Sequence, residues 1–165
     1  MKKNKTKPWV FRAFLAFAAV LAAFSPARAQ YPYLQIADVM VTPENQDNIT
    51  SNYITGMVRY DSAARTLILQ NATINRYDSG DPYDESNGQT LVVEAHSGQT
   101  VNIELIGHNT IFGTVPLVLG VGSYNITGEG SIILNGITEG VKCELGFDTF
   151  RIGRGAKVVD RKSVV

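Results

Sequence analysis

Apolar and polar residues alternate in the same way at three places in the second half of the chain. The three segments read VNIELIGHNTI (101–111), SYNITGEGSI (123–132) and DTFRIGRGAKV (148–158). Each holds two apolar residues six positions apart across a glycine-bearing turn: Leu105 and Ile111, Ile126 and Ile132, and Ile152 and Val158. Equivalent positions lie 21 and 26 residues apart, which suits one coil of a solenoid. The pattern predicts stacked coils, each with a strand, a corner and another strand.

Strand patterns also precede these repeats. Alternation over 66–74 places Leu67 and Leu69 on one face, after a turn at 61–64, and LVVEA (91–95) is a further strand candidate. Between residues 30 and 159 the sequence has no helix-period stripe with caps, so we predict an all-β fold. An antiparallel sandwich is the alternative, but it has no fixed long period, and the repeated six-residue spacing favours a parallel solenoid.

The solenoid interpretation assigns a face to each residue of the repeats. Apolar residues on the inward side would stack into one core that no single coil could bury alone; they are Val101, Ile103, Leu105, Tyr124, Ile126, Phe150 and Ile152. Glycines fit corners at which the backbone turns or takes a positive φ; they are Gly107, Gly128, Gly130, Gly153 and Gly155. Asn71 and Asn125 fit turn or ladder positions.

The run GMVRYDSAARTLILQNATI (56–74), followed by IELIGHNTI (103–111) and ITGEGSIIL (126–134), carries a family resemblance. It resembles secreted surface proteins of Gram-negative anaerobes of the Bacteroides type, which are described as having a β-helical, carbohydrate-binding-like domain. The resemblance covers about residues 34–159. It implies a right-handed parallel β-helix and a place at or beyond the cell surface, and it brings no catalytic motif.

Both ends of the chain differ from the repeats. Residues 1–29 have the pattern of a signal peptide, with four early lysines, the apolar run AFLAFAAVLAAF and the triplet Ala27-Arg28-Ala29. The run is shorter than the roughly 20 residues that span a bilayer, so we expect cleavage before Gln30 and export to the periplasm, cell surface or medium. The last six residues, DRKSVV (160–165), match a translated sequencing adapter. We expect an artificial tail there, with 30–159 forming the N-terminal coils of a truncated β-helix.

Removal of the signal peptide changes the charge of the chain. Six of the 15 basic residues lie in 1–29, which leaves nine basic and 15 acidic residues and a net charge of −6. An acidic protein lacks the basic surface that attracts nucleic acids and anionic membranes, so we expect neither partner. Cys143 is the single cysteine, so no internal disulfide is possible, and we expect it to be a small buried hydrophobe.

The acidic segment RYDSGDPYDESNG (76–88) is the candidate binding site. Its carboxylates offer the hard oxygen ligands that Ca²⁺ prefers, at Asp78, Asp81, Asp84 and Glu85. Tyr77 and Tyr83 could stack on sugar rings. The spacing matches neither an EF-hand nor a calcium-binding nonapeptide repeat, and such a loop is also typical of a solvated surface. No other cofactor is expected.

Catalytic patterns are missing from the sequence. A glycoside hydrolase needs two carboxyl groups facing one bond, whereas the glutamates here are scattered, at Glu94, Glu104, Glu129 and Glu144. Arg151 and Arg154, candidates for a lyase base, have no acidic neighbours in sequence. His96 and His108 have no zinc-site spacing and no G-x-S-x-G partner, so we interpret them as turn or rim residues.

Two functions fit these observations. The first is an exported, non-catalytic β-solenoid that displays a surface for a polysaccharide or a host glycoprotein. The alternative is the N-terminal fragment of a β-helical polysaccharide lyase or glycoside hydrolase, whose catalytic coils would lie downstream.

Overall fold

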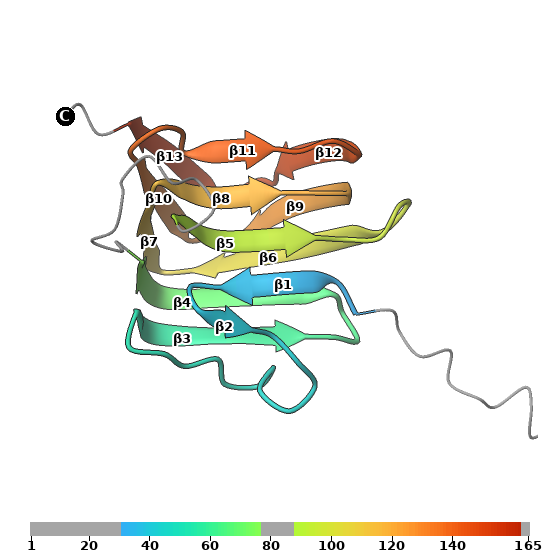
Figure 1. Cartoon of the computed structure of the whole chain (residues 1–165), viewed down its shortest axis with the longest axis horizontal. Coiled ribbons are helices and arrows are strands. Elements are labelled where there is room, and N and C mark those ends of the chain that lie inside the picture. Colours follow the sequence, from blue (N-terminus) through green and yellow to red (C-terminus); the bar gives the residue numbers. More distant parts are fainter. Residues whose placement is uncertain (1–30, 77–87, 163–165) are drawn as a thin grey trace, which may run out of the picture. The chain divides into compact units, whose positions relative to one another are not determined.

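The computed structural model describes residues 31–76 and 88–162 (Figure 1). The predicted signal peptide (1–29) and residues 163–165 of the predicted tail lie outside these ranges. The described residues contain strands and no helix, so the all-β prediction is confirmed for them, and they include no helix that could cross a membrane. The strands are β1 (Tyr33–Ile36), β2 (Val39–Met40), β3 (Ile54–Asp61), β4 (Thr66–Asn75), β5 (Gln89–Glu94), β6 (Thr100–Ile106), β7 (His108–Gly113), β8 (Val115–Leu119), β9 (Gly122–Gly128), β10 (Ser131–Gly136), β11 (Val141–Cys143), β12 (Phe147–Ile152) and β13 (Lys157–Lys162).

Most of these strands pair in parallel with the equivalent strand of the next repeat. Strand β8 lies between β5 and β11, β9 lies between β6 and β12, and β10 lies between β7 and β13. The first set belongs to a five-stranded sheet and the other two to an eight-stranded sheet (Figure 1). Because strands distant in sequence pair in parallel with a regular offset, the architecture is solenoid-like, as the repeats predict.

The register of the first repeat differs from the prediction. Ile126 pairs with Ile103 rather than with Leu105, so the first offset is 23 residues instead of 21. Ile111 likewise pairs with Leu134 rather than with Ile132. The second offset of 26 residues is confirmed by the pair of Ile126 and Ile152. Strand side chains alternate with a period of two, so a slip of two residues kept the predicted inward face correct.

Inward residues of the middle coils form the core. Side chains at the predicted inward positions of β6 and β9 are almost fully buried: Val101, Ile103, Leu105, Tyr124 and Ile126. The last coil is different, because Phe150 is half-buried and Ile152 is 51% exposed. The prediction that Ile152 is a core residue is therefore wrong. Strand β12 is the edge of its sheet, and no further described strand covers the side chain.

The first coil is closed by antiparallel strands. Strand β3 pairs antiparallel with β4, through a turn in which the Asp61 carboxylate accepts a hydrogen bond from the Ala64 amide at 2.9 Å. Strand β1 pairs antiparallel with β5 and with β2. The connecting segment buries Ile49, and the Tyr60 amide donates to the Gln46 carbonyl at 2.7 Å. This end of the core is covered, whereas no described strand pairs with the outer edges of β11, β12 and β13.

Asparagines and glycines shape the corner between neighbouring strands, and of the predicted corner glycines Gly107, Gly128 and Gly155 have a positive φ. Strand β4 pairs with β6 through Gln70 and with β7 from Thr73, and the bend between these halves lies at Asn71, which has a φ of 49°. The buried Asn109 amide accepts a hydrogen bond from the Ala72 amide at 2.8 Å and donates to the Ser131 carbonyl at 3.1 Å. One side chain therefore joins three successive coils. The predicted ladder role of Asn125 is confirmed by its hydrogen bond to Asn102 at 3.2 Å.

The C-terminal coil departs from the repeat pattern in two further ways. Cys143 is exposed, so the prediction of a buried cysteine is wrong, because β11 is an edge strand with no described neighbour beyond it. Asp160 pairs with Leu134, in the column that Ile74 and Ile111 occupy in earlier coils. The apolar column thus ends where the predicted artificial tail begins.

Candidate functional site

The acidic segment predicted as a binding site lies outside the described residues. This applies to Tyr77, Asp78, Asp81, Tyr83, Asp84 and Glu85 alike, so the calcium site stays a prediction. At the start of the segment, the Arg76 guanidinium donates hydrogen bonds to the Ala37 carbonyl at 2.9 Å and to the Gln89 carbonyl at 3.4 Å. In the ranges 31–76 and 88–162, no group of three His, Cys, Asp or Glu side chains could hold a metal ion.

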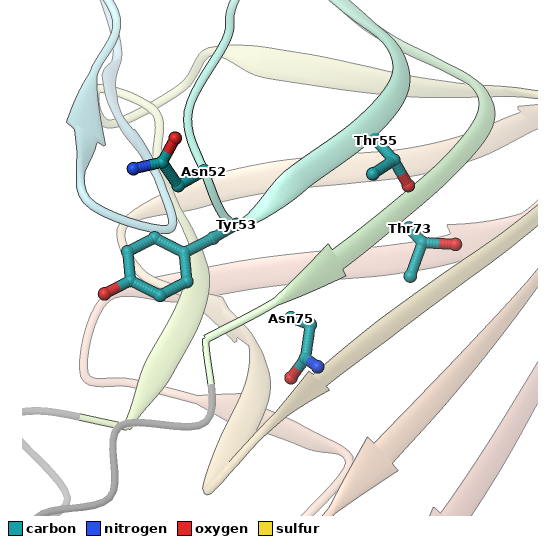
Figure 2. A pocket seen from close by; sticks show the side chains of 5 residues that line it. All are labelled: Asn52, Tyr53, Thr55, Thr73 and Asn75. Atoms are coloured by element: carbon teal, nitrogen blue, oxygen red, sulfur yellow. The ribbon is translucent and has the colours of Figure 1, made fainter.

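The described residues form a different candidate site beside strands β3 and β4. It is an open pocket of about 470 Å³, called the β3–β4 pocket below. Figure 2 shows the five side chains that line it: Asn52, Tyr53, Thr55, Thr73 and Asn75. Tyr53 and Thr73 are half-buried, and the other three are exposed. An aromatic ring, two amides and two hydroxyls therefore share one open surface.

Local hydrogen bonds fix the two residues that precede β3. The Ser51 hydroxyl accepts a hydrogen bond from the Tyr53 amide at 2.9 Å, and the Ser51 carbonyl accepts one from the Ile54 amide at 3.2 Å. A serine that bonds to the backbone two residues on is a common turn-forming device. The Tyr53 carbonyl then accepts a hydrogen bond from the Asn75 amide at 2.9 Å. These bonds hold Tyr53 at the end of β4, opposite Asn75.

A bulge in β3 lets the two strands bend together and form the pocket. The register shifts between Thr55 and Met57, at Gly56, whose φ is 83°. A Cβ at Gly56 would clash with the carbonyl oxygen of Asn71, the residue at the bend in β4. Glycine is therefore needed there for its left-handed backbone and for the close approach of the two strands. Beyond the bulge, Thr55 pairs with Thr73, and their side chains lie next to each other (Figure 2).

The polar groups of the pocket suit recognition and not proton transfer. The lining contains no carboxylate, histidine or amine. Amides and hydroxyls can donate and accept hydrogen bonds, and an aromatic ring can cover the apolar face of a ligand. General acid–base catalysis would need a titratable group within hydrogen-bond reach of the ligand with a pKa near the working pH. The pocket therefore offers an aromatic ring and neutral hydrogen-bonding groups.

Other candidate groups do not assemble into a catalytic site in the described part of the chain. The His108 Nδ1 atom lies 2.9 Å from the Ser131 hydroxyl on an exposed face, but no described carboxylate hydrogen-bonds to the imidazole. Glu104 lies between Ile68 and Thr127, and Glu94 pairs with Tyr33, so neither faces a second acid across the sheet.

The exposed cysteine is also a poor nucleophile. Cys143, Glu144 and Leu145 line a second open depression of about 490 Å³ at the edge of β11. Partial burial raises the pKa of the Cys143 thiol, and the nearby Glu139 carboxylate raises it further by a smaller amount. The reactive species of a cysteine is the thiolate, and a raised pKa lowers its population at neutral pH.

Comparison with known proteins identifies no relative: no protein-family model, curated protein or solved structure matches the chain. The candidate site consequently depends on its geometry. Sequence reasoning missed the β3–β4 pocket, although one signal was present. Thr73 and Asn75 alternate with the buried residues Ala72 and Ile74, which marks the former as outward-facing. Nothing in the sequence shows that Tyr53 lies beside Asn75, because this depends on the antiparallel pairing.

Proposed function

We propose that the chain is an exported, non-catalytic, right-handed parallel β-helix that binds glycans on its outer surface. The strand order supports the β-helix, because the chain visits the three sets of strands in the same sequence in each coil: β5, β6 and β7, then β8, β9 and β10, then β11, β12 and β13. The predicted signal peptide supports export. We propose the same partners that the sequence predicts, a polysaccharide or a host glycoprotein.

The observation that carries the binding function is the uncharged lining of the β3–β4 pocket. Sugars present hydroxyl groups around an apolar ring face, and the pocket offers amides and hydroxyls around the ring of Tyr53. Binding sites for small polar ligands commonly combine an aromatic or apolar wall with a few fixed polar groups. The alternative of a lyase or hydrolase fragment needs catalytic carboxylates that this pocket does not supply.

A glycan array followed by titration calorimetry tests the proposal. The array identifies a bound glycan, and calorimetry compares the parent chain with Tyr53→Ala and Asn52→Ala. We expect each variant to bind at least about tenfold more weakly, since truncating an aromatic or hydrogen-bonding contact at the centre of a site typically has this effect. Asn52 is exposed, so its replacement tests the pocket without disturbing the core.

Tyr33→Ala is the matched control. Tyr33 is 41% exposed on β1, in the other sheet, and its hydroxyl donates to the Gln35 side chain at 2.8 Å. The control should bind the glycan as the parent does. If Tyr33→Ala weakened binding as much as Tyr53→Ala, or if the array showed no bound glycan, the proposed function would be wrong.

A further inference from the structure

The β3–β4 pocket continues onto the neighbouring parallel strands without a break in register. Thr73 pairs with Thr110 of β7, and Thr110 pairs with Ile133 of β10. In the same way Asn75 pairs with Phe112, and Phe112 with Asn135. These six side chains are called the outer strip below: Thr73, Asn75, Thr110, Phe112, Ile133 and Asn135.

The burial pattern shows that the outer strip faces away from the core. In β7 the alternate residues Asn109, Ile111 and Gly113 are buried, whereas Thr110 and Phe112 are half-buried. In β10 the same alternation leaves Ile133 and Asn135 half-buried. Successive side chains of a strand point to opposite faces of the sheet, so the half-buried residues form one outer surface. Each strand repeats this pair of positions about 4.8 Å further on.

The chemistry of the outer strip repeats that of the pocket. Phe112 is a second aromatic ring beside Asn75 at the pocket's edge, and Asn135 supplies a further amide one strand beyond. None of the six residues is ionisable. The first charged side chains described next to the strip on this face are Lys157 and Arg161 of β13. At the corner, the strip is bordered by Ser131 and His108. A ligand lying along the pocket and the strip would meet neutral hydrogen-bonding groups and the rings of Tyr53 and Phe112.

We infer that the ligand is an extended, neutral polysaccharide that lies across β4, β7 and β10, with the β3–β4 pocket holding one of its sugar units. This inference rests on the proposed glycan-binding function and specifies the class of glycan. A pyranose unit in an extended chain has a length close to the strand spacing, so successive units can meet successive strands in similar positions. A single sugar in the pocket would leave Phe112 and Asn135 without a part in binding.

Oligosaccharides of increasing length test this inference on the full chain. Calorimetry would use β-1,4-linked glucose, mannose and xylose oligomers, from the disaccharide to the hexasaccharide, with oligogalacturonates as acidic probes of matched length. We expect the hexasaccharide of a bound neutral series to bind about tenfold or more tightly than its disaccharide, because it reaches the second aromatic residue. Oligogalacturonates should bind more weakly than the neutral series.

Variants at Phe112 separate the strip from the pocket. Phe112→Ala should reduce the affinity for the hexasaccharide to that for the disaccharide and leave disaccharide binding unchanged. Phe112→Tyr keeps the ring and should keep the length dependence, and circular dichroism would show whether each variant is folded. Tyr53→Ala should weaken binding of both lengths.

The outcomes distinguish this inference from the proposed function. Equal affinities for all lengths, with Tyr53→Ala still weakening them, would leave glycan binding intact and overturn the extended-chain inference. If the acidic probes bound more tightly than the neutral oligomers, the inference that the ligand is neutral would be wrong. The same holds if the array showed binding of a different glycan class and none of the neutral oligomers bound. Absence of any bound glycan on the array would overturn both proposals.

Discussion

Two buried tyrosines in different polar surroundings allow a matched test of the core. The Tyr124 hydroxyl accepts a hydrogen bond from the Ala95 amide at 3.0 Å and lies 2.9 Å from the Val93 carbonyl and 2.7 Å from that of Val121. Tyr60 is equally buried, but within 31–76 and 88–162 its hydroxyl has no hydrogen-bond partner. Phenylalanine at either position keeps the ring and removes only the hydroxyl.

The two substitutions should therefore have different consequences for the free energy of unfolding. Tyr124→Phe leaves the Ala95 amide buried without its partner, and such a group costs about 1–3 kcal/mol. Tyr60→Phe removes a polar group whose burial without a partner itself costs about 1–3 kcal/mol, so stability should stay unchanged or rise. The two variants should therefore differ in free energy of unfolding by at least about 1 kcal/mol, and by more if Tyr60→Phe is stabilising.

Ring contacts are preserved in both variants, which makes the comparison specific to the hydroxyls. Tyr124 stacks on Phe147 with ring centroids 6.1 Å apart, and Tyr31 meets Tyr60 edge-on with centroids 5.3 Å apart. Urea unfolding followed by circular dichroism would measure both free energies, with equal slopes showing that the unfolding transition is unchanged. Equal destabilisation of the two variants, or an unchanged stability of Tyr124→Phe, would refute the assigned hydrogen bonds.

Three further predictions concern the core, alkaline stability and the open edge. Leu105→Asp should unfold the chain, because a carboxylate at a fully buried position costs several kcal/mol. The control Ile106→Asp, at a residue that is 39% exposed, should fold. A melting temperature of Leu105→Asp equal to that of the parent would contradict the inward assignment. Burial raises the pKa of Tyr60 and Tyr124 from 10.0 to about 12, so the unfolded chain loses these protons at a lower pH than the folded chain. Stability should therefore be unaffected by these groups below pH 10 and should fall as the pH rises toward 12. Urea unfolding across this range should show that loss, and a flat profile would disagree with it. A fragment of residues 30–159 should self-associate through its unpaired strand edges, with half-buried Phe150 and exposed Ile152 at the contact. Light scattering that finds a monomer at all concentrations would contradict this prediction.

Alternation along the chain was sufficient to predict which residues face the core. Val101, Ile103 and Leu105 are buried as predicted, although the predicted register of the first repeat differs from the observed register by two residues. Side chains of a strand alternate between the two faces of the sheet, so two positions share a face when they are an even number of residues apart. A register error of two residues therefore leaves the predicted face unchanged. The same argument failed for Ile152 and Cys143. Burial there depends on a neighbouring coil, which a local pattern does not report.

Strand content, inward faces and corner glycines were predictable from the sequence, because these follow from local alternation and backbone conformation. The proposed binding surface was not, because it depends on which distant strands pair. Tyr53 meets Asn75 through an antiparallel pair, and Phe112 reaches Asn75 through a parallel pair of strands 37 residues apart in sequence. Such pairings depend on hydrogen bonds between distant strands and on the bend at Gly56 and Asn71, and a one-residue change in register would turn the same side chains to the opposite face.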